Sequence, residues 1–97
     1  MKKTANIEKF VRDNYLSNNI RISSPVLRVY LIESGIKKAV CEICGLSEWQ
    51  GKPMPLELHH KNGNHIDNSE DNVMILCPNC HAQITRHISD ATIKEAL

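Results

Sequence analysis

The chain has 97 residues and a formal net charge of +1, with 41% hydrophobic and 24% charged residues. This length accommodates one small domain with at most an appendage, and so short a domain gains from a staple such as a metal ion. No apolar run approaches the roughly 18 residues that a membrane-spanning helix requires. The basic N-terminus also lacks the apolar segment of a secretory signal. These features predict a cytoplasmic protein with no membrane partner.

Charge is unevenly distributed along the chain. Residues 1–40 carry eight basic and three acidic side chains, a net charge of +5, whereas residues 41–97 carry a net charge of −4. Such a basic segment is either a surface that attracts phosphate or an ordinary solvated surface, and charge alone does not separate the two. If the chain binds DNA, the N-terminal segment is expected to supply much of the attraction.

Residues 5–17 and 24–34 are predicted to form helices. Apolar side chains recur near the 3.6-residue period in the first of them. Ser24 and Pro25 suit the start of the second helix, and Gly35 suits its C-terminal end. Two short helices, the second one basic, fit either a helix-turn-helix-like DNA reader or an amphipathic pair that packs on the core. Packing is the favoured role, with DNA contact by exposed basic side chains in addition.

The second part of the chain alternates strands and loops before a final helix. The segment from Trp49 to Pro55 contains two prolines and one glycine and is predicted to be a loop. After it, the pattern indicates a strand, an exposed polar loop, a short buried strand and a helix, at residues 56–60, 65–72, 73–76 and 79–88.

Four cysteines form two Cys-x-x-Cys pairs, Cys41 with Cys44 and Cys77 with Cys80. In a short secreted chain they could form disulfides, but the sequence carries no secretory signal and a reducing cytosol disfavours disulfides. A redox role would account for one pair, but for neither the second pair nor the histidines nearby. Two intervening residues is the spacing at which adjacent thiolates fit one tetrahedral ion. A structural Zn²⁺ held by the four cysteines is therefore predicted.

Three histidines lie between and beside the cysteine pairs. His59 and His60 are adjacent on a predicted strand, so their side chains should point to opposite faces. Such a pair suits two separate tasks, one histidine binding a metal and the other facing the substrate. His81 lies in the first turn of the final helix, from which it can reach the same ion.

These motifs resemble the HNH nucleases, whose core is the ββα-metal fold, and they are similar to the small HNH proteins of phages and prophages. The resemblance covers residues 41–83 and implies an α+β fold class, in which a small ββα-metal (HNH) core is stapled by a four-cysteine zinc site and preceded by two short N-terminal helices. It also implies a basic helical segment at 1–38, a nuclease domain at 39–97, and action in the cytoplasm of a bacterial host cell, with a phage gene as one origin. The matching stretches are Cys41-Glu42-Ile43-Cys44-Gly45, Glu48-Trp49, Leu56-Glu57-Leu58-His59-His60-Lys61-Asn62-Gly63, Asn72 and Cys77-Pro78-Asn79-Cys80-His81.

The resemblance implies a metal-dependent DNA endonuclease that hydrolyses phosphodiester bonds with one catalytic ion. It assigns His60 as the general base and Asn72 as the residue that orients this base. It assigns His59 and His81 as ligands of the catalytic ion. A neutral imidazole can accept a proton at pH 7, and a divalent ion stabilises charge on the reacting phosphate.

His59 departs from the Asp that is more usual at this position of the family. Imidazole in place of a hard anionic ligand disfavours Mg²⁺ relative to Mn²⁺, Ni²⁺, Co²⁺ or Zn²⁺. The colicin nuclease domains are similar in having His here, and some of them add a further His one helical turn beyond the second ligand, where this chain has Thr85. The identity of the catalytic metal is therefore left open.

Other polar residues receive less specific assignments. His65 is expected to be a surface residue, and Asn68 a turn former that is also a second candidate for a site contact. A non-catalytic zinc-ribbon module that binds nucleic acid and a structural phage protein stay open as alternative functions, and so does the oligomeric state. The candidate DNA contacts are Arg21, Arg28, Lys37, Lys38, Lys52, Lys61 and Arg86.

Overall fold

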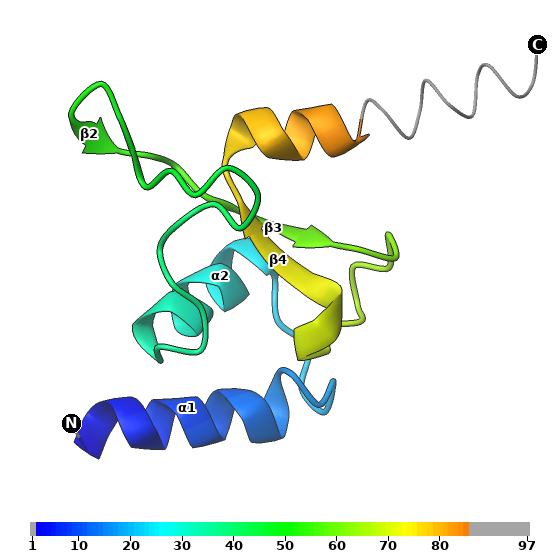
Figure 1. The fold of residues 1–97 in the computed structure, drawn as a ribbon. Coiled ribbons are helices and arrows are strands. Elements are labelled where there is room, and N and C mark those ends of the chain that lie inside the picture. The colour runs from blue at the N-terminus through cyan, green and yellow to red at the C-terminus, as the bar shows by residue number, and fades with distance from the viewer. Residues whose placement is uncertain (1, 86–97) are drawn as a thin grey trace, which may run out of the picture.

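The computed structural model describes residues 2–85 of the chain. Its helices and strands confirm the α+β class, and no described helix has the length and apolar character needed to cross a membrane. Two helices lie on one side of a central strand pair, and the last helix lies on the other side (Figure 1). The elements are α1 (Lys2–Asn14), α2 (Ser24–Glu33), β1 (Glu48–Trp49), β2 (Lys52–Pro53), β3 (Glu57–His60), the 3-10 helix η1 (Glu70–Asn72), β4 (Val73–Leu76) and a helix over residues 78–85.

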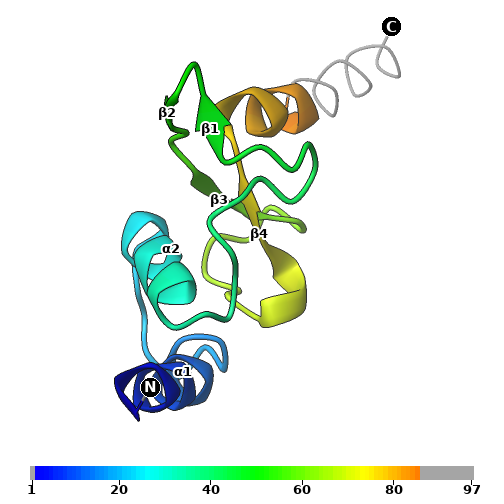
Figure 2. The same ribbon diagram turned by 60° about the vertical axis from the view of Figure 1, so that its left-hand side comes forward.

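The central strand pair and the last helix form the predicted ββα unit. Strands β3 and β4 are antiparallel, with Glu57 opposite Leu76 and His60 opposite Val73. Figure 2 shows the last helix following directly from the end of β4. Along β3, Leu58 and His60 are buried while Glu57 and His59 are half-buried, because successive side chains of a strand point to opposite faces. The predicted separation of His59 from His60 is thus confirmed.

The start of α2 lies one residue earlier than the sequence pattern suggested. Ser23, not Ser24, is the N-cap, since its φ of −73° and ψ of 151° are extended. Ser24 is already helical, and Pro25 still lies in the first turn, where its missing N–H costs nothing. The first helix also differs from the prediction, since it spans Lys2–Asn14 and turns, not helix, follow it.

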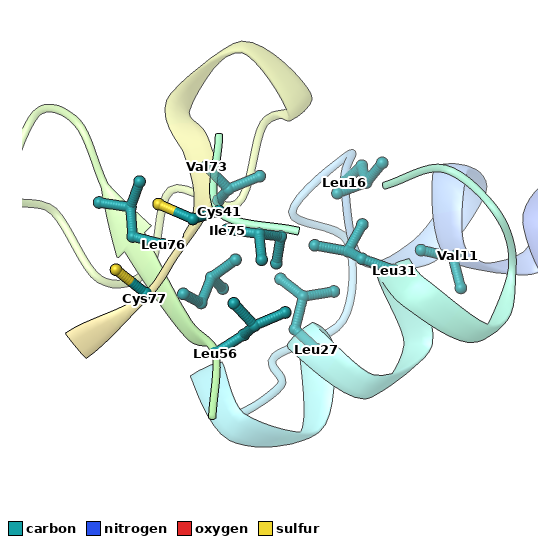
Figure 3. Close-up of a cluster of buried hydrophobic side chains, with 11 residues drawn as sticks. Val11, Leu16, Leu27, Leu31, Cys41, Leu56, Val73, Ile75, Leu76 and Cys77 are labelled. Carbon is teal, nitrogen blue, oxygen red and sulfur yellow. The ribbon is translucent and has the colours of Figure 1, made fainter. Parts of the chain in front are cut away.

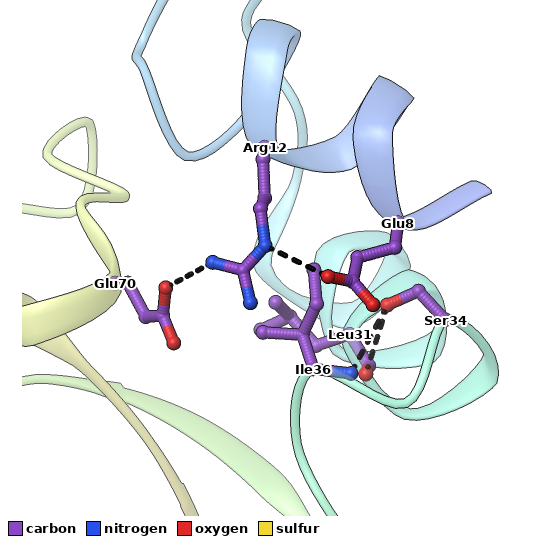
Figure 4. A network of polar contacts seen from close by, with 6 residues as sticks. All are labelled: Glu8, Arg12, Leu31, Ser34, Ile36 and Glu70. Carbon is purple, nitrogen blue, oxygen red and sulfur yellow. Dashed lines mark hydrogen bonds and ion pairs between the residues drawn. The ribbon is translucent and has the colours of Figure 1, made fainter. Parts of the chain in front are cut away.

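The end of α2 is closed by Ser34 and Gly35. The buried Ser34 hydroxyl donates to the carbonyl of Leu31 at 3.2 Å and accepts from the N–H of Ile36 at 3.4 Å (Figure 4). Gly35 has a φ of 82°, in the left-handed region that glycine adopts without steric cost. The predicted helix end is confirmed, and the chain turns here toward the first cysteine pair.

The hydrophobic core joins the N-terminal helices to the strand pair. Leu27 and Leu31 of α2 are fully buried, with Val11 of α1 on one side and Ile75 of β4 on the other (Figure 3). Helix α2 therefore packs into the core, as the amphipathic alternative predicts, and the core is continuous across the predicted boundary between 38 and 39. The buried hydrophobic residues are Val11, Leu16, Leu27, Leu31, Cys41, Leu56, Leu58, Val73, Ile75, Leu76 and Cys77.

A small hairpin replaces the predicted loop from Trp49 to Pro55. Strands β1 and β2 pair antiparallel, with Trp49 opposite Lys52. The two turn residues Gln50 and Gly51 have φ values of 53° and 78°, and a two-residue turn with positive φ at both positions matches the twist of antiparallel strands. The prediction was wrong because a Gln-Gly pair lacks the strong turn signal of Asn-Gly or Asp-Gly.

Candidate active site and metal centre

The four cysteines lie together where the loop between α2 and β1 meets the start of the last helix. Their sulfur atoms all lie within 4.8 Å of one another, and Sγ of Cys44 is 3.9 Å from Sγ of Cys77. The cysteines are free thiols, without disulfides. With Zn–S bonds of about 2.3 Å, the edge of an ideal tetrahedron is about 3.8 Å. The cluster therefore fits a tetrahedral Zn²⁺.

Backbone pairing along β4 brings the two cysteine pairs together. In the first pair, Gly45 has a φ of 77° and its N–H donates to the carbonyl of Cys41 at 2.9 Å. Glu42 then pairs with Ile75: its N–H donates to the Ile75 carbonyl at 2.9 Å, and its carboxylate accepts from the Ile75 N–H at 2.6 Å. Because Cys77 follows two residues after Ile75, this pairing fixes one cysteine turn beside the other.

Two thiols of the cluster differ strongly in acidity. Burial acts to raise the pKa of Cys41, but backbone hydrogen bonds at Cys44, Cys77 and Ile43 outweigh it and lower that pKa to about 6. Burial raises the pKa of Cys80 to about 12, and the neighbouring cysteines act in the same direction. One thiolate is thus already favoured at neutral pH, and a bound cation would deprotonate the remaining thiols.

His59 and His81 face each other across the ββα unit. Their ring centres are 5.2 Å apart, with the ring planes at 71°. One ion could contact a nitrogen of each ring at this separation, since metal–imidazole bonds are about 2.1 Å long. Nδ1 of His81 is 2.7 Å from a carboxylate oxygen of Glu57. That contact fixes the proton on Nδ1 and leaves Nε2 of His81 as the available metal ligand.

The environment of His59 favours its neutral form. Burial lowers the pKa of His59 below its ordinary value, and charge on His81, His60, His65 and Lys61 lowers it further. A metal binds only the deprotonated ring nitrogen, so a lowered pKa reduces the competition from protons. This is the electrostatic setting expected of a metal ligand.

His60 points away from this pair and is nearly buried, with 3% of its surface exposed. Its Nε2 is 2.7 Å from Oδ1 of Asn68, which is itself 4% exposed. An amide oxygen only accepts hydrogen bonds, so Nε2 carries the proton and Nδ1 keeps its lone pair. Nδ1 of His60 is buried and has no hydrogen-bond partner among the described residues. A buried acceptor without a partner calls for an explanation, and a catalytic role is one of the few available.

Asn72 holds the ends of the loop between β3 and β4 together. Its Oδ1 accepts from the N–H of Asn62 at 3.0 Å, and its Nδ2 donates to the carbonyl of Asp67 at 2.7 Å. Its own carbonyl accepts from the N–H of Lys61, next to His60, at 2.8 Å. Asn72 is therefore linked to His60 through the backbone of Lys61, whereas Asn68 contacts the His60 ring. The orienting role of Asn72 stays a prediction.

The three histidines line one cleft. It has a volume of about 570 Å³, and its walls also include Lys61 and His65. A second cleft of about 440 Å³ shares His65 with the first and is also lined by Arg21, on the segment between α1 and α2. His65 is exposed, as expected, but it lies beside His60, with the ring centres 5.1 Å apart.

Comparison with known families matches residues 41–87 to the HNH endonucleases. Over 73 residues the chain is 51% identical to the H-N-H endonuclease F-TflIV of Escherichia phage T5. By both comparisons the chain is similar to the HNH endonucleases. The match to the phage protein covers 75% of this chain. Because only 57 residues follow residue 40, part of this match lies in the segment before the first cysteine.

The chain covers only a small part of the length of each relative. The Zorya protein ZorE of Escherichia coli is 38% identical over 48 residues, which is half of this chain and 13% of that protein. The phage endonuclease is covered over 32% of its length. The chain thus spans about a third of the first relative and about an eighth of the second. No solved structure matches the chain significantly.

The HNH core brings most of its predicted site residues together, but the basic candidates differ in their surroundings. Lys61 and Arg21 line the two clefts. Arg28 donates instead to the Leu56 carbonyl, and Lys37 is paired with Glu42 at 3.2 Å. Lys38 and Lys52 are exposed, and Arg86 lies outside the described residues. All seven stay predicted DNA contacts.

From the sequence, no role was assigned to Glu57 and only a secondary role to Asn68, two residues of this HNH site. Glu57 precedes His59 by two positions and so shares its face of β3, a period-2 signal that could have found it. Asn68 lies in a polar loop with several other asparagines, and no local pattern distinguishes it. Its contact with His60 depends on how the loop folds back.

Replacing Glu57 with alanine is expected to weaken divalent-ion binding at the histidine pair about 10–100-fold, because His81 loses the partner that fixes its ring. Titration calorimetry with Mn²⁺ or Ni²⁺, on protein whose cysteine site is already filled with zinc, measures the loss. Glu57→Gln keeps an oxygen acceptor and should lose less. Glu48→Ala, an exposed carboxylate on β1, serves as the matched control. Equal affinity in Glu57→Ala and Glu48→Ala would contradict this role.

Proposed function

We propose that this chain is a metal-dependent endonuclease domain that hydrolyses phosphodiester bonds in DNA, with His60 as the general base. The observation that carries the proposal is the state of the His60 ring. Its Nε2 is held by Asn68, its buried Nδ1 is left without a partner among the described residues, and His60 lines the same cleft as the His59–His81 pair. His59 and His60 project from opposite faces of β3, and both line this cleft together with His81 of the last helix.

The residues divide the reaction between them. His59 and His81 are the proposed ligands of the catalytic ion, and Glu57 holds the second of them in place. With a divalent ion bound there, these residues would place positive charge near the scissile phosphate. His60 takes a proton at Nδ1 from the attacking water, and Asn68 accepts the hydrogen bond from Nε2–H throughout. Asn72 keeps the loop closed around the base.

The ligand set points to a transition metal. Two imidazoles are softer ligands than carboxylates, and they favour Mn²⁺, Co²⁺, Ni²⁺ or Zn²⁺ over Mg²⁺. The cysteine cluster is proposed to hold a separate structural Zn²⁺, because four thiolates leave no coordination position open for substrate.

A plasmid nicking assay tests the proposed function. Zinc-loaded protein is incubated with supercoiled DNA and each of the ions Mg²⁺, Mn²⁺, Co²⁺, Ni²⁺ and Zn²⁺, and a chelated sample serves as the blank. Cutting that requires an added ion, and is faster with Mn²⁺ or Ni²⁺ than with Mg²⁺, is the expected result. DNA binding without cutting under every ion would favour a non-catalytic zinc module instead.

Lys61 and Arg21 are expected to contribute most to DNA binding among the described basic residues, because they line the two adjoining clefts. Replacing either with alanine should weaken binding and lower the slope of log affinity against log salt by about 0.9, the value for one lost phosphate contact. Fluorescence anisotropy with a labelled duplex over a salt series measures both quantities.

Lys9 provides the matched control for these substitutions. It is an exposed lysine on α1 whose partner is Asp13 at 2.8 Å, and it lines neither cleft. Lys9→Ala should leave the salt slope unchanged. A loss of slope in Lys9→Ala equal to that in Lys61→Ala would show that general charge, and not the cleft, attracts the DNA.

A further inference from the structure

The segment between α1 and α2 reaches the general base through a chain of hydrogen bonds. Oδ1 of Asn18 accepts from the N–H of Asn68 at 2.6 Å. Oδ1 of Asn68 then accepts from Nε2 of His60 at 2.7 Å. Only one residue, Asn68, separates the N-terminal segment from the proposed base, although Asn18 and His60 are 42 positions apart in the sequence.

Asn18 contacts three consecutive residues of the loop between β3 and β4. Besides the bond to Asn68, its Nδ2 lies 3.3 Å from Oδ1 of Asp67 and 3.4 Å from Oγ of Ser69. Asn18 makes these contacts from a φ of 62°, a left-handed conformation that asparagine tolerates better than most residues other than glycine. The three contacts indicate that the Asn18 side chain, and not the turn alone, is needed at this position.

A second tether joins the same two segments. Arg12 of α1 pairs with Glu70, at the start of η1, and with Glu8 on its own helix at 3.2 Å (Figure 4). The loop is thus held from α1 at Glu70 and from the following turn at 67–69, while Asn72 holds its inner side. The N-terminal segment fixes the loop from outside the ββα unit.

We propose that Asn18 is a positioning residue: it holds Asn68, and through it the His60 ring, in the orientation and tautomer that leave Nδ1 free. This inference rests on the proposed function of His60 as the base. The hydrogen bond that one ring nitrogen of a histidine makes determines which of the two neutral forms is present. Without the Asn18 side chain the loop is less restricted, and the Asn68 acceptor moves away from Nε2 of His60. Part of the His60 population then carries its proton on Nδ1, and a protonated Nδ1 cannot accept the proton of the attacking water.

Asn18→Gly is the substitution that isolates the side chain. Glycine keeps the left-handed backbone without strain, so the turn itself should persist. Asn19→Gly is the matched control, because Asn19 is a neighbouring exposed asparagine whose side chain makes no hydrogen bond to the described residues. Asn68→Ala removes the acceptor, and Asn68→Asp restores one at the same place.

The primary readout does not depend on cleavage. Long-range ¹H–¹⁵N spectra of zinc-loaded protein without a catalytic ion, at about pH 8, report which ring nitrogen of His60 carries the proton. Wild type, Asn19→Gly and Asn68→Asp should show the proton on Nε2. Asn18→Gly and Asn68→Ala should show a mixture of the two forms.

Cleavage kinetics provide the second readout. In Asn18→Gly, kcat should fall about 10-fold while KM for DNA stays within about twofold, since only the fraction of correctly oriented base changes. An unchanged His60 tautomer in Asn18→Gly would overturn the proposal, whatever happens to the rate. A changed tautomer with an unchanged rate would support the positioning role of Asn18 but count against His60 as the base. The failure of this proposal and the failure of the proposed function are therefore distinguishable.

Discussion

His60→Ala is expected to lower the rate of metal-dependent DNA cleavage about 10²–10⁴-fold, the range that a positioned general base contributes. The variant removes the nitrogen that accepts the proton of the attacking water. It leaves His59 and His81 in place, so binding of the catalytic ion and of DNA should change little. The loss should therefore appear in kcat and not in KM. Single-turnover cleavage of a labelled duplex at saturating Mn²⁺ measures it directly.

His65→Ala is the informative comparison for this experiment. His65 lies beside His60, with the ring centres 5.1 Å apart, but it is exposed and lacks the bond to Asn68 that fixes the tautomer of His60. It should lose far less activity than His60→Ala. Zinc content and DNA affinity of both variants establish that each is folded. Cleavage by His60→Ala at the wild-type rate, or an equal loss in both variants, would contradict the assignment of the base.

The parts of this site that depend on spacing could be predicted from the sequence. The two Cys-x-x-Cys turns are each closed by local geometry, and strand periodicity places His59 and His60 on opposite faces. Helix α2 was located to within one residue for the same reason, because Pro25 and Gly35 act on their immediate neighbours. Features that depend on neighbouring residues in the chain can therefore be predicted from the sequence.

The parts that depend on distant contacts could not be predicted. The bond between Asn68 and His60 joins a polar loop to the strand β3 on which it folds back, and Glu57 meets His81 from a different element. The pairing of Arg12 with Glu70 spans 58 positions. Each side chain could equally be a solvated surface group. The folding of the ββα unit brings Glu57 to His81 and Asn68 to His60, and the packing of α1 on the core brings Arg12 to Glu70. The basic charge of the N-terminal segment therefore suggested DNA binding, whereas its position also gives it a role in holding the loop.

Cys44→Ser is expected to destabilise the whole domain severely. Cys44 is exposed, and an exposed residue with no special role changes stability by less than about 0.5 kcal/mol when replaced. As one of four zinc ligands, however, it is coupled to folding, since structural zinc binding contributes on the order of 10 kcal/mol in small domains. The small core alone cannot replace a contribution of that size.

Thermal unfolding followed by circular dichroism, together with zinc analysis, tests this coupling. Wild-type protein should hold one zinc per chain at the cysteines and unfold cooperatively, whereas Cys44→Ser and chelated wild type should both lose the transition. Adding Zn²⁺ back should restore it in the wild type only. Because Cys77 follows β4 directly and Cys80 precedes His81 by one residue, loss of zinc should also separate His81 from His59. Cleavage should then fall with zinc content even when Mn²⁺ is saturating, and a Cys44→Ser protein that stays folded and active would refute the structural role of the cluster.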